Sequence, residues 1–104
     1  MQEKRKNQRI NVSFPVECNL PSTRSYFYTV SKDLSISGTK ILTNEFIARN
    51  QTLKLNINLV DRVLNVRGKV VWCNREPSLE RYSAGIEFEG ISRENKDYLN
   101  SFLA

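Results

Sequence analysis

Apolar and polar residues alternate along this chain, and the alternation limits the folds that it can adopt. In the first such stretch an apolar side chain stands at every second position from residue 10 to residue 20. This period of two predicts a half-buried strand, because successive side chains of a strand point to opposite faces of the sheet. Pro15 removes one backbone donor, which indicates an edge strand or a bulge. The apolar positions are Ile10, Val12, Phe14, Val16, Cys18 and Leu20.

Five later stretches also have strand character. Alternation recurs over residues 53–59, and most of the other stretches are rich in the β-branched and aromatic residues that strands favour. Glu87 stands between two apolar residues, which predicts an outward side chain. We expect strands at 26–30, 39–42, 53–59, 63–72 and 82–88, a bend at Gly68 and a hairpin loop over 75–81.

The end of the chain changes its period. Its apolar residues fit a stripe of 3.6 residues, typical of an amphipathic helix, and Ser92 is the expected N-cap. Six strands followed by one short helix predict a mainly β protein, a six-stranded antiparallel β-barrel with a short C-terminal α-helix. Closure of a barrel removes the sheet edges that invite aggregation. The stripe consists of Ile91, Tyr98, Leu99, Phe102 and Leu103.

The length of 104 residues fits one domain. Residues 1–8 are polar and show no periodicity, so we expect a flexible basic arm there and the barrel domain with its helix over 9–104. The net charge is +5, and the first nine residues supply +3 of it. This favours an anionic partner, without choosing among a nucleotide, a nucleic acid and a membrane surface.

Several classes of function fit poorly. The chain has no histidine and no Cys-x-x-Cys pair, which argues against a metal site, and no persuasive catalytic pair of side chains, which argues against an enzyme or a catalytic cofactor. Cys18 and Cys73 lie in apolar stretches and are interpreted as core residues of a protein in a reducing compartment, the cytoplasm. The chain has no apolar run of 18 residues, so membrane insertion is not expected.

Two arginines, Arg5 and Arg9, are candidate ligand-binding residues. A guanidinium group can bind phosphate oxygens, or the O6/N7 edge of guanine, through two parallel hydrogen bonds. Four residues span at most ~13–14 Å, so the two side chains can reach opposite sides of one ligand. The alternative is a solvated basic terminus that only aids solubility.

A second candidate group is Asp33-x-Ser35-x-x-Gly38. Side chains two residues apart on an extended segment share a face. Asp33 could accept from the N1–H and N2–H₂ groups of guanine, with the Ser35 hydroxyl beside it. Gly38 is expected at a positive φ or in a bulge, where it lets the backbone approach a ligand. The alternative is a plain turn, which the same residue types favour.

The order of these elements resembles the PilZ domain family, which is known for binding the bacterial second messenger cyclic di-GMP. The resemblance covers nearly the whole chain, and both diagnostic motifs of the family, the arginine pair and the Asp-x-Ser-x-x-Gly segment, are intact. Residues 70–72, Val-Val-Trp, and 85–88, Gly-Ile-Glu-Phe, support it. The chain is similar to a single-domain member, since no stretch of it resembles an output domain.

The resemblance implies a barrel of the split-barrel type, and it implies roles for particular residues. Arg5 and Arg9 would wrap the ligand, and the residues Asp33, Ser35 and Gly38 would line a guanine pocket on the barrel. Trp72 lies where some members place an aromatic side chain against the ligand, although a place in the barrel core or rim is an equal alternative. Lys4 stands at a position that influences whether one ligand or a stacked pair binds, and a lysine there leaves the outcome open. Lys40 replaces an arginine of many relatives, which keeps the charge and loses the fork geometry.

The sequence therefore predicts a cyclic di-GMP receptor or adaptor. Its arginine arm would become ordered over the ligand and present a new surface to a protein effector of unknown identity. One alternative is a PilZ-like interaction module that binds no nucleotide. A less favoured one is a small basic barrel that binds single-stranded nucleic acid through Tyr26, Phe27, Tyr28 and Trp72.

Overall fold

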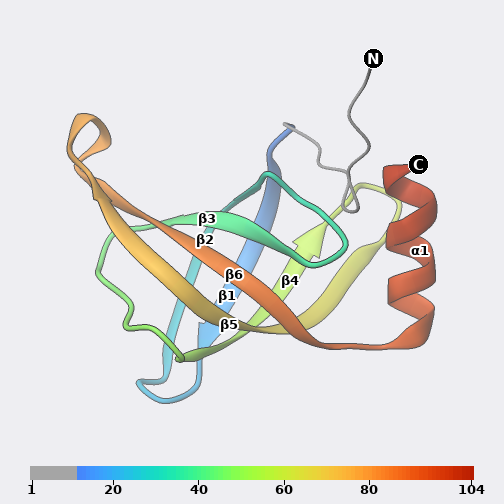
Figure 1. The fold of residues 1–104 in the computed structure, drawn as a ribbon, viewed down its shortest axis with the longest axis horizontal. Coiled ribbons are helices and arrows are strands. Elements are labelled where there is room, and N and C mark those ends of the chain that lie inside the picture. Colours follow the sequence, from blue (N-terminus) through green and yellow to red (C-terminus); the bar gives the residue numbers. More distant parts are fainter. Residues whose placement is uncertain (1–11) are drawn as a thin grey trace.

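A computed structural model describes residues 12–104, which form a six-stranded antiparallel barrel with one C-terminal helix (Figure 1). The expected fold class is confirmed. The expected arm and the domain boundary at residue 9 lie outside the described residues, so both stay predictions. The elements are β1 (Phe14–Leu20), β2 (Ser25–Lys32), β3 (Gly38–Thr43), β4 (Thr52–Asn58), β5 (Val63–Glu76), the 3₁₀ turn η1 (Pro77–Leu79), β6 (Arg81–Ile91) and α1 (Arg93–Leu103).

The strands follow one another around the barrel in the order β1-β2-β3-β6-β5-β4, and β1 pairs with β4 to close it. The number of paired residues differs strongly between neighbours. The longest ladder joins β5 to β6, whereas β2 and β3 are joined by two pairs only, Ser31 with Ile41 and Lys32 with Lys40. The barrel is therefore complete, and its shortest junction is that between β2 and β3.

The barrel core is built from the apolar residues of the alternating stretches. Leu53, Leu55 and Ile57 of β4, for example, are buried, and the polar residues between them are exposed. At one end the helix α1 packs on the barrel through Leu99 and Leu103, and Figure 1 shows it beside the yellow β4–β5 region. Burial of this apolar face stabilises a helix that is too short to persist alone.

The helix begins where the sequence predicts. The Ser92 hydroxyl accepts a hydrogen bond from the Asn95 backbone N–H at 3.1 Å, which confirms Ser92 as the N-cap. Phe102 contacts Phe14 of β1 edge to face, with ring centroids 5.6 Å apart. This contact joins the last turn of the helix to the start of the barrel.

Three details of the expected strands need correction, and a fourth is confirmed. The first strand begins at Phe14, and Val12 is exposed, so the alternation there continues past the end of the sheet. Pro15 does not lie in an edge strand, since β1 has neighbours on both sides; it stands one residue before the β4 pairing starts at Val16. The hairpin after β5 is tighter than expected, because β5 extends to Glu76. The bend at Gly68 is confirmed by a register shift between residues 67 and 68.

Both cysteines are free. Cys18 is fully buried in the core, and burial raises the pKa of its thiol to about 12. Cys73 is partly buried and packs against the core. Between residues 12 and 104, no helix is long and apolar enough to cross a membrane.

Candidate functional site

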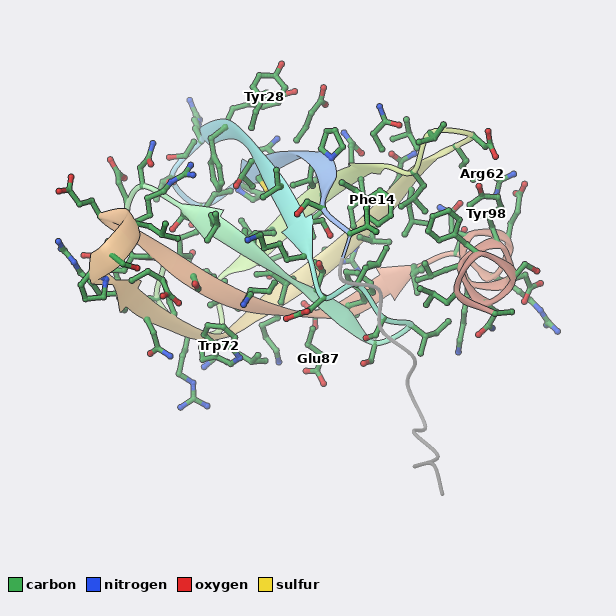
Figure 2. All side chains as sticks on the ribbon, turned by 90° about the horizontal axis from the view of Figure 1, so that it is seen from above. Phe14, Tyr28, Arg62, Trp72, Glu87 and Tyr98 are labelled. Atoms are coloured by element: carbon green, nitrogen blue, oxygen red, sulfur yellow. The ribbon has the colours of Figure 1, made fainter. Side chains whose placement is uncertain are left out.

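A hollow of about 270 Å³ lies where the segment between β2 and β3 faces the middle of β5 and β6. We call it the Asp33 hollow. It brings together Asp33, Ser35 and Gly38 with Trp72, which is more than thirty positions further along the chain. Figure 2 shows Trp72 and Glu87 projecting from the same side of the barrel. The lining residues are Asp33, Ser35, Ser37, Gly38, Thr39, Lys40, Val71, Trp72, Gly85, Ile86 and Glu87.

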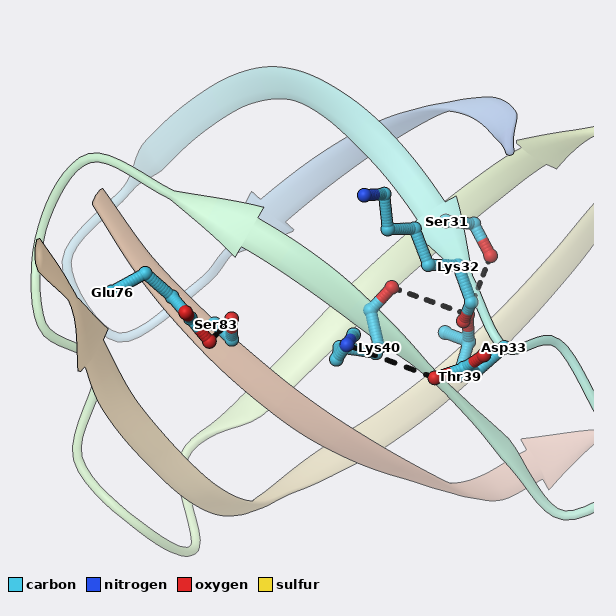
Figure 3. Close-up of polar contacts among 7 residues, drawn as sticks. All are labelled: Ser31, Lys32, Asp33, Thr39, Lys40, Glu76 and Ser83. Carbon is cyan, nitrogen blue, oxygen red and sulfur yellow. Dashed lines mark hydrogen bonds and ion pairs between the residues drawn. The ribbon is translucent and has the colours of Figure 1, made fainter. Parts of the chain in front are cut away.

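Asp33 lies at a sharp bend of the backbone. Its φ is 49°, a left-handed conformation that aspartate tolerates better than most residues, so the segment is not extended at this point as expected. Asp33 and Ser35 line the same hollow because of the bend rather than because of strand alternation. The Lys40 Nζ lies 3.7 Å from Asp33 Oδ2, an ion pair that Figure 3 shows at the start of β3.

Ser35 is buried and holds the bend together. Its Oγ accepts a hydrogen bond from the Ser37 backbone N–H at 3.2 Å and donates to the Gly38 carbonyl at 3.3 Å. The Ser35 backbone N–H also donates to this carbonyl at 2.9 Å. The serine therefore makes the local bonds of a turn, and its hydroxyl reaches the hollow from inside that turn.

Gly38 is required for a different reason than the sequence indicates. None of the four glycines has a positive φ, so the expected left-handed conformation is wrong. A Cβ atom at Gly38 would instead collide with the Ile86 carbonyl oxygen of β6. The glycine permits β3 to begin in close contact with the β6 backbone, and this contact forms one corner of the Asp33 hollow.

Trp72 lies on the rim of the barrel and not in its core. Its side chain is 38% exposed, and the indole packs so closely over Gly85 that a Cβ there would collide with the ring nitrogen Nε1. A register shift between Val70 and Trp72 marks an irregularity of β5 at this point. Such bulges re-aim side chains, which accounts for the ring lying along the wall of the hollow.

Hydroxyl groups that the sequence analysis did not single out support the bend. The Thr39 hydroxyl donates to the Lys32 carbonyl at 2.7 Å and lies 2.5 Å from the Ser31 hydroxyl, and both side chains are buried (Figure 3). These bonds join the end of β2 to the start of β3. The sequence gives little indication of this role for Ser31 and Thr39, because serine and threonine are common on either face of a strand.

The charge of the hollow is mixed. Asp33 and Glu87 carry negative charge and Lys40 carries positive charge, while Glu87 is exposed as its alternation predicts. No arginine among residues 12–104 lines the hollow. The described residues thus offer hydrogen-bonding groups and an aromatic wall, but no guanidinium fork for a phosphate. Arg5, Arg9 and Lys4 lie outside the described residues.

The aromatic side chains that the nucleic-acid alternative requires are dispersed over the barrel. Tyr26 and Tyr28 are exposed on β2, while Phe27 packs against the core. Figure 2 shows Tyr28 on the opposite side of the barrel from Trp72. These four aromatic residues do not form one surface on which a nucleic acid strand could stack. Within residues 12–104 there is also no group of three or more side chains that could hold a metal ion.

These features define a small closed β-barrel with an open hollow, lined by both polar and apolar side chains, at the bend between its second and third strands. The chain belongs to the PilZ domain family, which matches residues 3–104. This confirms the resemblance inferred from the two motifs. No curated protein matches the chain.

Solved structures with this fold come from several bacterial proteins. The inhibitor of motility MotI/DgrA from Bacillus subtilis has a TM-score of 0.83 at 17% identity, over 98% of this chain and 50% of that one, so this chain spans about half of its length. The PilZ domain of YcgR from Escherichia coli, solved with c-di-GMP, has a TM-score of 0.74 at 14% identity, over 97% and 89% of the two chains. The PilZ domain of CeSA from a cellulose-synthesizing bacterium has a TM-score of 0.69 at 12% identity, over 91% and 93%. At these identities the likeness establishes the fold alone.

Proposed function

We propose that this chain is a cytoplasmic receptor for cyclic di-GMP that signals through a protein partner and catalyses no reaction. The observation that carries the proposal is the convergence of Asp33, Ser35, Gly38 and Trp72 on one open hollow in a member of the PilZ family. Asp33, Ser35 and Gly38 belong to one short segment, and the barrel brings Trp72, from a distant part of the sequence, to the same place. A solved PilZ domain of the same fold, that of YcgR, contains c-di-GMP.

The hollow suits one guanine base. The ion pair with Lys40 involves Asp33 Oδ2, and an ionised carboxylate has about four acceptor sites, so Oδ1 can accept from the N1–H and N2–H₂ edge of guanine. The indole of Trp72 offers a face for stacking across the hollow, which is worth about 1–3 kcal/mol per base in single-strand binding sites. Ser35 and Gly38 shape the floor by holding the bend.

The hollow cannot enclose the whole ligand. Its volume of about 270 Å³ lies below the roughly 300–1,000 Å³ of sites that bury a drug-sized molecule. Asp33 and Glu87 also outnumber Lys40, so the hollow does not attract the anionic phosphodiester groups of the ligand by charge. The remaining contacts must come from cationic groups that are brought to the open side.

We assign these remaining contacts with the ligand to Arg5 and Arg9. Arg9 precedes Phe14 by five residues, and five residues span at most ~17 Å. Phe14 pairs with Ser31, two positions before Asp33, so the hollow is within reach of the arginine side chains. In this proposal the arm folds over the bound ligand, and Lys4 beside it affects whether one ligand or a stacked pair is held.

Calorimetric titration with cyclic di-GMP tests the proposal. Arg9→Ala and Asp33→Ala should each weaken binding at least tenfold, since each removes a charged hydrogen bond worth about 1.5–3 kcal/mol. Arg49→Ala and Asp61→Ala are matched controls, because both residues are exposed and neither lines the hollow. Unchanged affinity in both test variants would overturn the site.

A wild-type protein that gives no heat and no NMR shift with the ligand would instead indicate an interaction module that is independent of nucleotide. Binding of single-stranded nucleic acid with a steep salt dependence would favour the third alternative.

A further inference from the structure

The junction between β2 and β3 leaves a strand edge open. Residues 25–30 of β2 have a strand partner only in β1, because the pairing with β3 is limited to Ser31 and Lys32. Every second residue of a strand directs its N–H and C=O groups to the same side. The groups that point away from β1 therefore have no strand beside them in the described part of the chain. Figure 3 shows the ribbon of β2 diverging from that of β3 on the Ser31 side of this short junction.

A second hollow, of about 440 Å³, lies in this opening, and we call it the β2–β3 seam. The buried side chains Leu20, Leu42 and Ile47 form its floor. Its walls carry Tyr26, Tyr28 and Phe46, which are 55%, 69% and 60% exposed. No residue of the seam lines the Asp33 hollow. Exposed aromatic side chains around an apolar floor are the composition of protein-binding hot spots.

The charge of the seam selects among possible occupants. Arg81 lines it, and its Nε donates to Asn44 Oδ1 at 3.3 Å. Among residues 12–104, Arg81 forms no ion pair. Among the lining residues that the structure describes, Glu45 is the only acidic one, and it belongs to the exposed loop after β3. The partly buried guanidinium is thus complementary to a carboxylate that comes from outside.

We propose that the β2–β3 seam binds an extended segment of a partner protein, which adds to β2 as a strand. Main-chain hydrogen bonds to residues 25–30 would supply affinity, as in other cases of strand addition. Apolar side chains at every second position would enter toward the floor, and one acidic side chain would pair with Arg81. A rigid small molecule fits less well, because the open groups of β2 repeat every two residues, about 6.6 Å apart.

This inference does not depend on cyclic di-GMP binding, because the seam and the Asp33 hollow share no residue. The partner segment should therefore bind with or without a nucleotide. If both proposals hold, one barrel carries two sites, one for a small ligand and one for a peptide strand.

The test uses random nine-residue peptides displayed on phage and selected on the complete chain. Enriched peptides should alternate apolar residues with polar ones and contain an acidic residue. Arg81→Glu and Phe46→Ala should each weaken their binding at least tenfold, whereas Trp72→Ala, on the rim of the other hollow, should leave it within twofold. A version of the best peptide with N-methyl groups on alternate backbone nitrogens should lose at least tenfold, because it cannot form the ladder.

NMR spectra of each variant establish that the barrel is intact. The best peptide should shift amide signals of residues 25–30 and 42–47. The proposal is overturned if no peptide is enriched, if the N-methylated peptide binds equally well, or if the shifted signals belong to the Asp33 hollow or the helix. Self-association of the closed barrel through residues 25–30 at the concentrations of the binding assay, seen as a dimer that the peptide does not dissociate, would also overturn it.

Discussion

Gly38→Ala and Gly85→Ala add the same methyl group on two sides of the Asp33 hollow, but they should differ sharply in cost. At Gly38 the new Cβ meets the Ile86 carbonyl oxygen, which is part of the β6 backbone and cannot move alone. At Gly85 it meets the indole of Trp72, a side chain on the rim that can rotate into solvent. The comparison isolates the effect of a rigid neighbour.

The cost at Gly38 can be worked from its contacts. Overpacking against a rigid group costs about 1–3 kcal/mol. If β3 moves away from β6, it strains the Ser35 N–H bond to the Gly38 carbonyl and the Phe88 N–H bond to the Ser37 carbonyl, both 2.9 Å long. Two such bonds contribute about 1–3 kcal/mol together, and the lower entropy of an unfolded alanine chain offsets about 0.4–1 kcal/mol. The net loss is roughly 1–5.5 kcal/mol.

Urea unfolding followed by circular dichroism measures this loss. Gly38→Ala should lower the midpoint by at least about 0.3 M, given a slope of about 1–3 kcal/mol/M. Gly85→Ala should cost about 1 kcal/mol or less, because the ring can leave. Trp72 is the one tryptophan, so its emission should move to longer wavelength in Gly85→Ala as the indole enters water. Equal costs for the two variants, or a loss below 1 kcal/mol for Gly38→Ala, would refute the argument from close approach.

Two further predictions concern stability. Val60 has a φ of 78° and is 85% exposed, so Val60→Gly should raise the free energy of unfolding by about 1 kcal/mol in the same urea assay; a loss would show that the valine makes a contact that offsets its strain. Cys18 has its pKa raised by burial from 9.0 to about 12, so between these values the unfolded chain loses a proton that the folded chain keeps, and stability falls as pH rises. The fall in the free energy of unfolding that this thiol causes as pH rises should be absent in Cys18→Ala.

The number and order of the elements follow from the sequence because they depend on local patterns. Alternation over residues 53–59 and the Ser92 cap each identify an element without reference to its neighbours. The ends of strands are harder to predict from the sequence. Val12 continues the alternation but is exposed, because the sheet ends where its neighbouring strands end.

The site was partly predictable because its central motif is also a local pattern. Asp33, Ser35 and Gly38 form a recognisable motif, and the structure places them at one hollow. The reasons for their positions were not predictable, since the collision at Gly38 involves Ile86, nearly fifty residues away. The seam had no signal either, because an unpaired strand edge is a property of two strands and not of one.

The short ladder between β2 and β3 has a consequence for the integrity of the ring. Two residue pairs close it there, so separation at this point breaks few bonds and leaves every other ladder intact. The product is an open curved sheet that still contains most of its native contacts, and such partial openings need less free energy than complete unfolding. Two molecules that open together can each accept the other's released edge, so intertwined dimers at high concentration are the state into which this barrel converts most directly.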